Sequence, residues 1–152
     1  MTDKVFSFQP SQSPATQDNA LSPSLVHAPS HYVEGRSIES YQVLERWNLV
    51  QHHYLACAFK YLARAGRKED AILDLNKALW YLGRFETLDV KLDPMSLTEE
   101  LAPLDLFADW GFSEESFRAQ ALWEVYAIAR CLQRSTRPLQ IILQRELHEL
   151  RE

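Results

Sequence analysis

The segment between residues 59 and 86, FKYLARAGRKEDAILDLNKALWYLGRFE, limits the fold more than any other part of the chain. On both sides of Gly66, apolar residues recur every three or four positions. That spacing places them on one face of a helix. Glycine readily adopts the left-handed conformation that ends helices. The segment therefore predicts two amphipathic helices joined by a short turn at Gly66.

Helical periodicity continues outside this hairpin, and no run of useful length alternates as a strand does. Helices are expected over about 37–47, 50–65 and 69–86, and a short one at the capping sequence Ser96-Leu97-Thr98-Glu99. Pro103 and Gly111 should interrupt the connecting region 87–112. A long helix should begin at an N-cap Ser113 and reach about Leu132, and Pro138 should break or restart it. The expected fold class is all-α, a small helical domain built on a central helical hairpin with long C-terminal helices.

Composition divides the 152 residues into three parts. Residues 1–30 are rich in Ser, Pro, Gln and Asn and predict a flexible N-terminal arm. Residues 31–86 form the helical core, and residues 87–152 form a C-terminal helical extension. The extension is expected to support a homo-oligomer, with the alternative that it covers the leucine face of the hairpin within one chain.

Charge and cysteine content restrict the class of protein. The net charge is −5, so a general nucleic-acid-binding protein is not expected. The two cysteines, Cys57 and Cys131, fall in apolar runs and predict buried free thiols in a reducing compartment. No apolar run approaches the ~18 residues of a membrane span, and no signal-peptide pattern is present. A cytoplasmic protein is expected, with no membrane partner.

Positive charge nevertheless gathers on the hairpin. Lys60, Arg64 and Lys68 follow a spacing of four and form one basic stripe. A second polar stripe on the next helix consists of Asp70, Asp74, Lys77, Tyr81 and Arg84. Two antiparallel helices bring such stripes to one groove, where lysine and arginine bind phosphate oxygens. The alternative is a lattice of salt bridges between the helices, and the sequence does not separate the two.

Several familiar sites are absent from the sequence. No two glycines have the spacing of a phosphate-binding P-loop, and neither a zinc motif nor a Gly-x-Ser-x-Gly motif occurs. A magnesium site built from helical acids is a weaker alternative that would use Glu39, Asp70 and Asp74. The four tryptophans are expected in the core, whereas Tyr32, Tyr61 and Tyr81 adjoin polar positions from which one of them could stack on a base.

Three blocks of sequence, in this order, resemble a known family. They are HYVEGRSIE at residues 31–39, KYLARAGRK at 60–68 and DLNKALWYL at 74–82. The resemblance is to the small phage-encoded, SaV-like nucleotide kinases, a domain-of-unknown-function family. Its characterised type is a coliphage enzyme that lacks a P-loop and phosphorylates deoxynucleoside monophosphates. The likeness covers about residues 31–86.

The resemblance implies a set of site residues. Lys60, Arg64, Asp74 and Lys77 would be catalytic, and substrate contacts would come from His31, Tyr32, Glu39, Tyr61, Lys68 and Tyr81. One departure concerns the pair before the second block, which is usually Gly-Asn in the family and is Ala56-Cys57 here. The missing amide bears on base choice and on catalysis.

The function expected from this resemblance is a phage nucleotide kinase acting in the host cytoplasm. It would use a nucleoside triphosphate as phosphate donor, with magnesium left open as a cofactor. The alternatives are a non-catalytic protein that binds or sequesters nucleotides, a metal-dependent all-α nucleotide pyrophosphatase, and a structural adaptor.

Overall fold

The computed structural model describes residues 37–67, 70–96, 101–133 and 135–152. Within them the regular structure is helical, which confirms the all-α class. The elements are α3 (Ser40–Arg46), a short 3₁₀ helix η2 (Leu49–Gln51), α4 (His53–Arg64), α5 (Ala71–Thr87), α6 (Pro103–Trp110), α7 (Phe117–Ala129) and α8 (Arg137–Arg151). Among these residues no helix has both the length and the apolar character needed to cross a membrane. The predicted arm at 1–30 and positions 97–100 of the predicted capping region lie outside the described residues.

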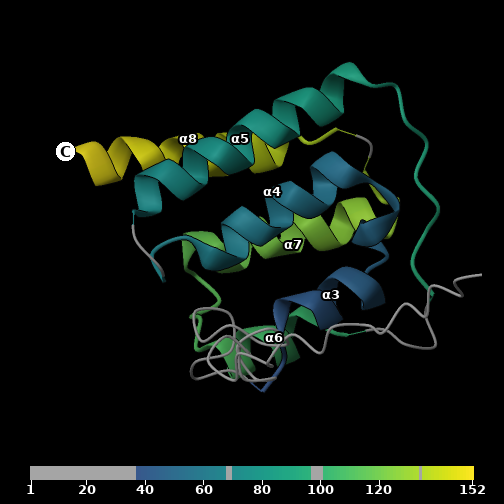
Figure 1. Cartoon of the computed structure of the whole chain (residues 1–152). Coiled ribbons are helices and arrows are strands. Elements are labelled where there is room, and N and C mark those ends of the chain that lie inside the picture. Colours follow the sequence, from purple (N-terminus) through teal and green to yellow (C-terminus); the bar gives the residue numbers. More distant parts are fainter. Residues whose placement is uncertain (1–36, 68–69, 97–100, 134) are drawn as a thin grey trace, which may run out of the picture.

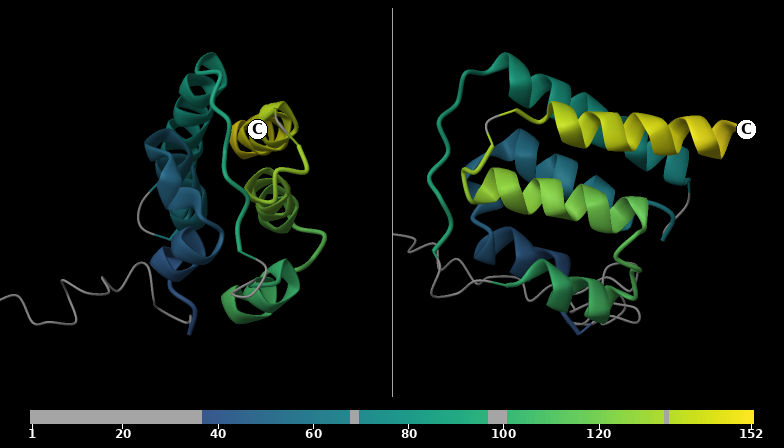
Figure 2. Two further views of the ribbon diagram at one scale, coloured as in Figure 1. Left: turned by 90° about the vertical axis from the view of Figure 1, so that its right-hand side faces the viewer. Right: turned by 180° about the vertical axis from the view of Figure 1, so that it is seen from behind.

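The six α-helices of the described residues lie in two layers (Figures 1 and 2). Figure 1 shows α3, α4 and α5 side by side in front, and Figure 2 shows α6, α7 and α8 as a second layer behind them. In both layers the helices follow one another in chain order, so α5 faces α8 and α3 lies near α6. The predicted hairpin, α4 and α5, makes the most extensive helix–helix contact in the molecule as described. This arrangement leaves one side of the hairpin for the core and the other for a site.

Apolar faces of four helices meet between the layers. The residues that pack there are Leu55, Ala58, Phe59 and Leu62 of α4, Leu82 of α5, Val125 of α7, and Leu139 and Leu143 of α8. Burying each large aliphatic side chain contributes roughly 1.5–3 kcal/mol. The C-terminal helices thus cover the leucine face of the hairpin within one chain. This is the arrangement that was given above as the alternative to an oligomer interface. The homo-oligomer itself stays a prediction.

An extended segment, residues 88–96, connects the layers, and we call it the strap. It runs from the end of α5 along one side of the molecule toward α6 (Figures 1 and 2). The side chain of Gln51 donates to the carbonyl of Asp93 and accepts from its N–H, both at 2.8 Å. The N–H of Met95 donates to the carbonyl of Ala129 at 3.2 Å. The strap is therefore attached to both layers.

Helix α6 fixes the beginning of α3. The carboxylate of Asp109 accepts hydrogen bonds from the backbone N–H groups of Ser37 and Ile38, the latter at 2.8 Å. The indole N–H of Trp110 donates to the carbonyl of Ile38 at 2.7 Å. These bonds join residues more than 70 positions apart in the sequence.

The predicted helix over 50–65 is interrupted at its start. Asn48 adopts a left-handed conformation with φ 53°, and His52 is extended, so η2 and α4 are separate elements. The ring Nδ1 of His52 accepts a hydrogen bond from the N–H of Tyr54 at 3.2 Å. His52 thereby caps α4, a role that helical periodicity alone does not reveal.

Two further boundaries were predicted wrongly. The N-cap of α7 is Ser116 rather than Ser113, because the Ser116 hydroxyl accepts the N–H of Ala119 at 3.2 Å. Pro103 does not interrupt a helix but occupies the first turn of α6, where a missing N–H costs nothing. Gly111 ends that helix with φ 73°, a conformation that favours glycine.

The cysteines differ from the prediction of buried thiols. Cys57 is half-buried, and Cys131 is exposed just beyond the end of α7. Cys131 has φ 57°, so the backbone turns there and carries the side chain away from the core. The apolar runs predicted helices around both residues, but they did not show that Cys57 is only half-buried on α4 or that α7 ends before Cys131.

Candidate functional site

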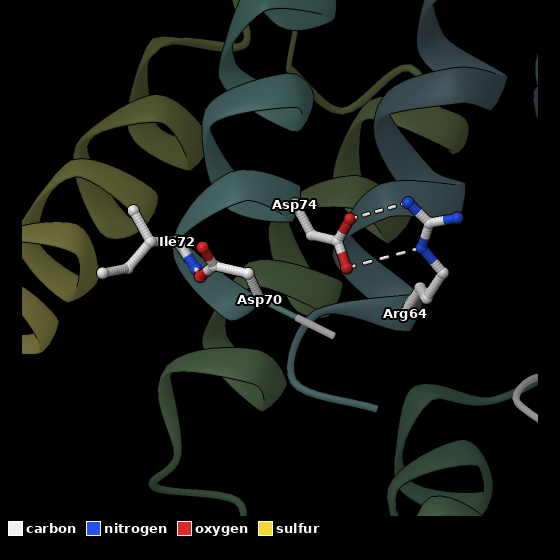
Figure 3. A network of polar contacts seen from close by, with 4 residues as sticks. All are labelled: Arg64, Asp70, Ile72 and Asp74. Atoms are coloured by element: carbon white, nitrogen blue, oxygen red, sulfur yellow. Dashed lines mark hydrogen bonds and ion pairs between the residues drawn. The ribbon is translucent and has the colours of Figure 1, made fainter. Parts of the chain in front are cut away.

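The site is built on the facing sides of α4 and α5. Helix α4 ends at Arg64, Gly66 takes a left-handed conformation with φ 77°, and α5 starts after Asp70. The carboxylate of Asp70 accepts the N–H of Ile72 at 2.9 Å and so caps α5 (Figure 3). The antiparallel arrangement predicted from the two polar stripes is therefore present.

Arg64 and Asp74 form a two-pronged ion pair across the hairpin. The Arg64 Nη2 atom lies 2.7 Å from Asp74 Oδ1, and Nε lies 3.4 Å from Oδ2 (Figure 3). The Asp74 side chain is 5% exposed and that of Arg64 is 16% exposed. A buried carboxylate needs such a partner, and the planar guanidinium is held in one orientation by it. The pair thus fixes the orientation of the guanidinium at the edge of the groove, with its charge balanced by Asp74.

Two tyrosines stack beside this pair. The rings of Tyr61 and Tyr81 are nearly parallel, with centroids 5.7 Å apart and planes inclined by 11°. The Arg64 guanidinium carbon lies 4.8 Å and the Lys77 ammonium 5.1 Å from the centroid of the Tyr61 ring. Aromatic faces attract cations, so Tyr61 gathers positive charge from both helices.

A small cavity adjoins the stacked rings. It has a volume of about 100 Å³, and its described lining consists of Cys57, Lys60, Tyr61 and Arg64. Lys60 is exposed at its rim. We call this cavity the phosphate pocket, because two cations and a phenol line a space that suits one tetrahedral anion.

Cys57 lies at the end of the phosphate pocket nearer the start of α4. Its Sγ atom is 3.7 Å from the Nε2 atom of His53. Burial, and the neighbouring Cys57, raise the pKa of the Tyr81 phenol above its ordinary value. Tyr81 therefore remains a hydrogen-bond donor at neutral pH.

A second cleft among the described residues, larger than the phosphate pocket, suits an anion less well. It has a volume of about 660 Å³ and lies along the strap, where Phe85, Glu86, Asp89 and Lys91 are among its lining residues. Burial opposes ionisation of Glu86, but hydrogen bonds from the hydroxyl and N–H of Thr136 and from Ser135 outweigh it and lower the pKa. An ionised Glu86 would repel phosphate, so the α4–α5 groove is the better candidate.

The structure brings together most of the predicted site residues. Lys60, Tyr61, Arg64, Asp74, Lys77 and Tyr81 meet in the α4–α5 groove. Glu39 is elsewhere: it is the N-cap of α3, where its side chain accepts the backbone N–H of Gln42. His31, Tyr32 and Lys68 lie outside the described residues. The salt-bridge alternative is realised for Arg64 and Asp74.

The carboxylates proposed for a magnesium site do not gather. Asp70 caps α5, Asp74 pairs with Arg64, and Glu39 caps α3. In the part of the chain that the structure describes, no three His, Cys, Asp or Glu side chains are close enough to hold a metal ion.

Two tryptophans that were expected in the core are exposed. Trp80, beside this groove, is 58% exposed, and Trp123, which lies on α7 away from the groove, is 41% exposed. A helical wheel could have predicted the exposure of Trp80. At 100° per residue, Trp80 lies about 140° around the helix from Leu75, which faces the core. His53 was also missed as a site residue: its ring lies near Tyr81, at a centroid distance of 6.4 Å, and near the Cys57 thiol.

The match found by comparison with known proteins includes most of the hairpin. A family model described only as a protein of unknown function, DUF3310, matches residues 26–83, which is less than half of the chain. The match includes α3, η2, α4 and most of α5, and so includes the phosphate pocket. No curated protein matches the chain. No solved structure matches it either.

Proposed function

We propose that this protein is a phage-type nucleotide kinase, which transfers a phosphoryl group from a nucleoside triphosphate to a deoxynucleoside monophosphate without a P-loop. The observation that carries the proposal is the phosphate pocket. Lys60 and Arg64 of α4 line it, together with the Tyr61 ring, which also contacts Lys77 of α5. The sequence resemblance to phage nucleotide kinases covers the same two helices.

Phosphoryl transfer requires little covalent participation by the protein. An oxygen of the monophosphate attacks the terminal phosphorus of the donor, the bond to the bridging oxygen breaks, and two diphosphates leave. Positioning and neutralisation of negative charge supply most of the rate. Lys60 and Lys77 would neutralise the phosphates, and Asp74 would act as a positioning residue that holds Arg64 in place.

A nucleotide screen tests the proposal. The protein is incubated with each deoxynucleoside monophosphate and ATP, with and without magnesium, and the products are separated by chromatography. We expect diphosphate from at least one monophosphate. In the Lys60→Ala and Lys77→Ala variants, kcat/KM should fall about 10²- to 10³-fold. Lys91→Ala, which removes an exposed lysine of the strap, is the matched control.

Each alternative has its own outcome in this screen. Unchanged nucleotides in the wild-type protein would refute the kinase. Conversion of triphosphate to monophosphate that depends on magnesium would indicate a hydrolase instead. Wild-type activity in both lysine variants would remove the phosphate pocket from the mechanism.

A non-catalytic nucleotide-binding protein is the second candidate. Its support is the small size of the phosphate pocket, about 100 Å³ against the roughly 300–1,000 Å³ of ordinary ligand sites, because a kinase must hold two nucleotides at once whereas a binding protein holds one. The presence of Ala56-Cys57 in place of the Gly-Asn pair of the phage kinases points the same way. Calorimetric binding of a monophosphate without any turnover would establish this candidate.

A further inference from the structure

Four rings gather at the end of the α4–α5 groove that is opposite to Arg64 and Asp74. We call His53, Tyr54, Trp80 and Tyr81 the aromatic patch. The Trp80 ring meets Tyr81 at a centroid distance of 5.0 Å and Tyr54 at 6.3 Å, both nearly perpendicular. Trp80 nevertheless remains 58% exposed.

Tyr54 and Tyr81 pack partly against the core, but Trp80 extends the aromatic patch beyond it. On α5 the buried face consists of Leu75, Ala78, Leu82 and Phe85, and Trp80 lies on another side of that helix. Single exposed apolar residues are common on proteins, but clustered aromatic rings with polar tips are typical of a surface that receives a ligand.

The aromatic patch and the phosphate pocket lie along the same pair of helices, and Tyr81 connects them through ring contacts with Tyr54 and Tyr61. A helix rises 1.5 Å per residue, so Trp80 lies about 9 Å along α5 from Asp74 and about 4.5 Å from Lys77. On α4, Tyr54 precedes Lys60 by six residues, again about 9 Å. The stacked pair Tyr61 and Tyr81 lies between the two ends. The groove therefore offers aromatic rings at one end and positive charge at the other, on the scale of a single small molecule.

We propose that the aromatic patch is the subsite for the nucleobase, with Trp80 as the stacking residue, and that the nucleotide lies along the groove with its phosphate at Lys60. This inference rests on the proposed function, because it assumes that the phosphate pocket holds phosphate. The charge pattern favours this occupant: a nucleotide has a flat ring at one end and negative charge at the other. Base–aromatic stacking is worth enough to decide affinity.

Three probes of increasing size test the subsite: inorganic phosphate, deoxyribose 5-phosphate and each of the four deoxynucleoside monophosphates. Binding is measured by calorimetry and by quenching of tryptophan fluorescence. At least one monophosphate should bind the wild-type protein roughly 5- to 100-fold more tightly than deoxyribose 5-phosphate. Trp80→Ala should abolish this difference and the quenching, and should leave the affinity for deoxyribose 5-phosphate unchanged.

Two matched variants keep the test specific. Trp123→Ala removes another exposed tryptophan, on α7, and should retain both the quenching and the preference for nucleotide. Trp80→Phe keeps an aromatic face and should restore most of the preference that Trp80→Ala loses.

Failure of the base subsite can be distinguished from failure of the proposed function. If deoxyribose 5-phosphate binds as tightly as every monophosphate, or if Trp80→Ala binds nucleotide like the wild type, the base subsite is wrong and the phosphate pocket stands. If no probe binds the wild-type protein, both proposals are overturned. If Trp80→Ala instead converts an oligomer to a monomer with unchanged nucleotide affinity, the aromatic patch is an interface between copies and this proposal is refuted.

Discussion

Arg64 belongs both to the candidate site and to the interior of the hairpin. It lines the phosphate pocket, and it neutralises the carboxylate of Asp74, which is 5% exposed. Removal of either partner leaves the other charge in a poorly hydrated place, which costs far more than the loss of a surface ion pair. Arg64→Ala therefore changes stability and phosphate affinity together, and Lys60→Ala is the cleaner test of the phosphate pocket.

The Asp74→Asn variant tests what the ion pair contributes to stability. The variant keeps the shape of the side chain and removes its charge, so the free energy of unfolding should fall by roughly 2–3 kcal/mol. Urea denaturation followed by circular dichroism measures the change. Asp70→Asn is the matched control: it lies one turn earlier, and asparagine also caps helices, so its cost should stay within about 0.5 kcal/mol. Equal costs for the two variants would contradict the importance of the buried ion pair.

At this scale the sequence predicted which residues meet but not how far each is buried. The spacing of Lys60, Arg64, Asp74 and Lys77 was sufficient to place them on facing stripes. Which residue of α4 pairs with which residue of α5 depends on how each helix is rotated about its own axis. The spacing within the stripes fixes that rotation only to within about one residue. Trp80 shows the limit most clearly: its size suggested the core, whereas its angle around the helix decided its exposure.

The ends of the helices are set by residues distant in the sequence as well as by local caps. Gly66 was predicted as the residue that ends α4, and its φ of 77° confirms this. The sequence could not show that Arg118 of α7 donates to the carbonyl of Ala65 at that same end. A Cβ atom at Gly66 would lie 2.6 Å from Arg118 Nη2, so the arginine adds a steric reason for glycine. Such contacts need the packing of α7, which no local pattern specifies.

His52 makes the start of α4 sensitive to pH. Burial, and the neighbouring His53, lower the pKa of His52 below its ordinary value. The folded state thus binds the proton less readily than the unfolded chain, so this contribution to stability is present above about pH 6.5 and is lost as the pH falls through the lower folded value. Protonation also removes the acceptor of the cap, worth about 1 kcal/mol.

The prediction is a difference between two pH profiles. The free energy of unfolding should fall between pH 7.5 and 5 by more in the wild type than in His52→Asn, which retains a cap acceptor that does not titrate. His148→Asn changes an exposed histidine on α8 and serves as the control. Identical profiles for the wild type and His52→Asn would show that His52 does not control the start of α4.

The whole molecule depends on the strap for its covalent continuity between the layers. Leu88, Asp89, Val90 and Lys91 are exposed and extended, and proteases cut such segments before they cut helices. Limited trypsin digestion should therefore cleave after Lys91 earlier than after any lysine or arginine within α4, α5, α7 or α8. Mass spectrometry of the early fragments identifies the bond. Prior cleavage inside one of these helices would mean that the strap is better protected than its exposure indicates.

Cleavage of the strap would divide the protein into two fragments. Apart from the strap, the two layers are held together by noncovalent contacts. These are the apolar contacts of α5 with α8, the hydrogen bonds between Gln51 and Asp93, and the hydrogen bonds between Asp109 and the start of α3. A nicked chain can therefore stay assembled as a complex of two fragments, one of which contains the whole α4–α5 groove. The genetic consequence is that the protein could be encoded in two pieces and reconstituted by fragment complementation, with recovered nucleotide binding as the readout of correct assembly.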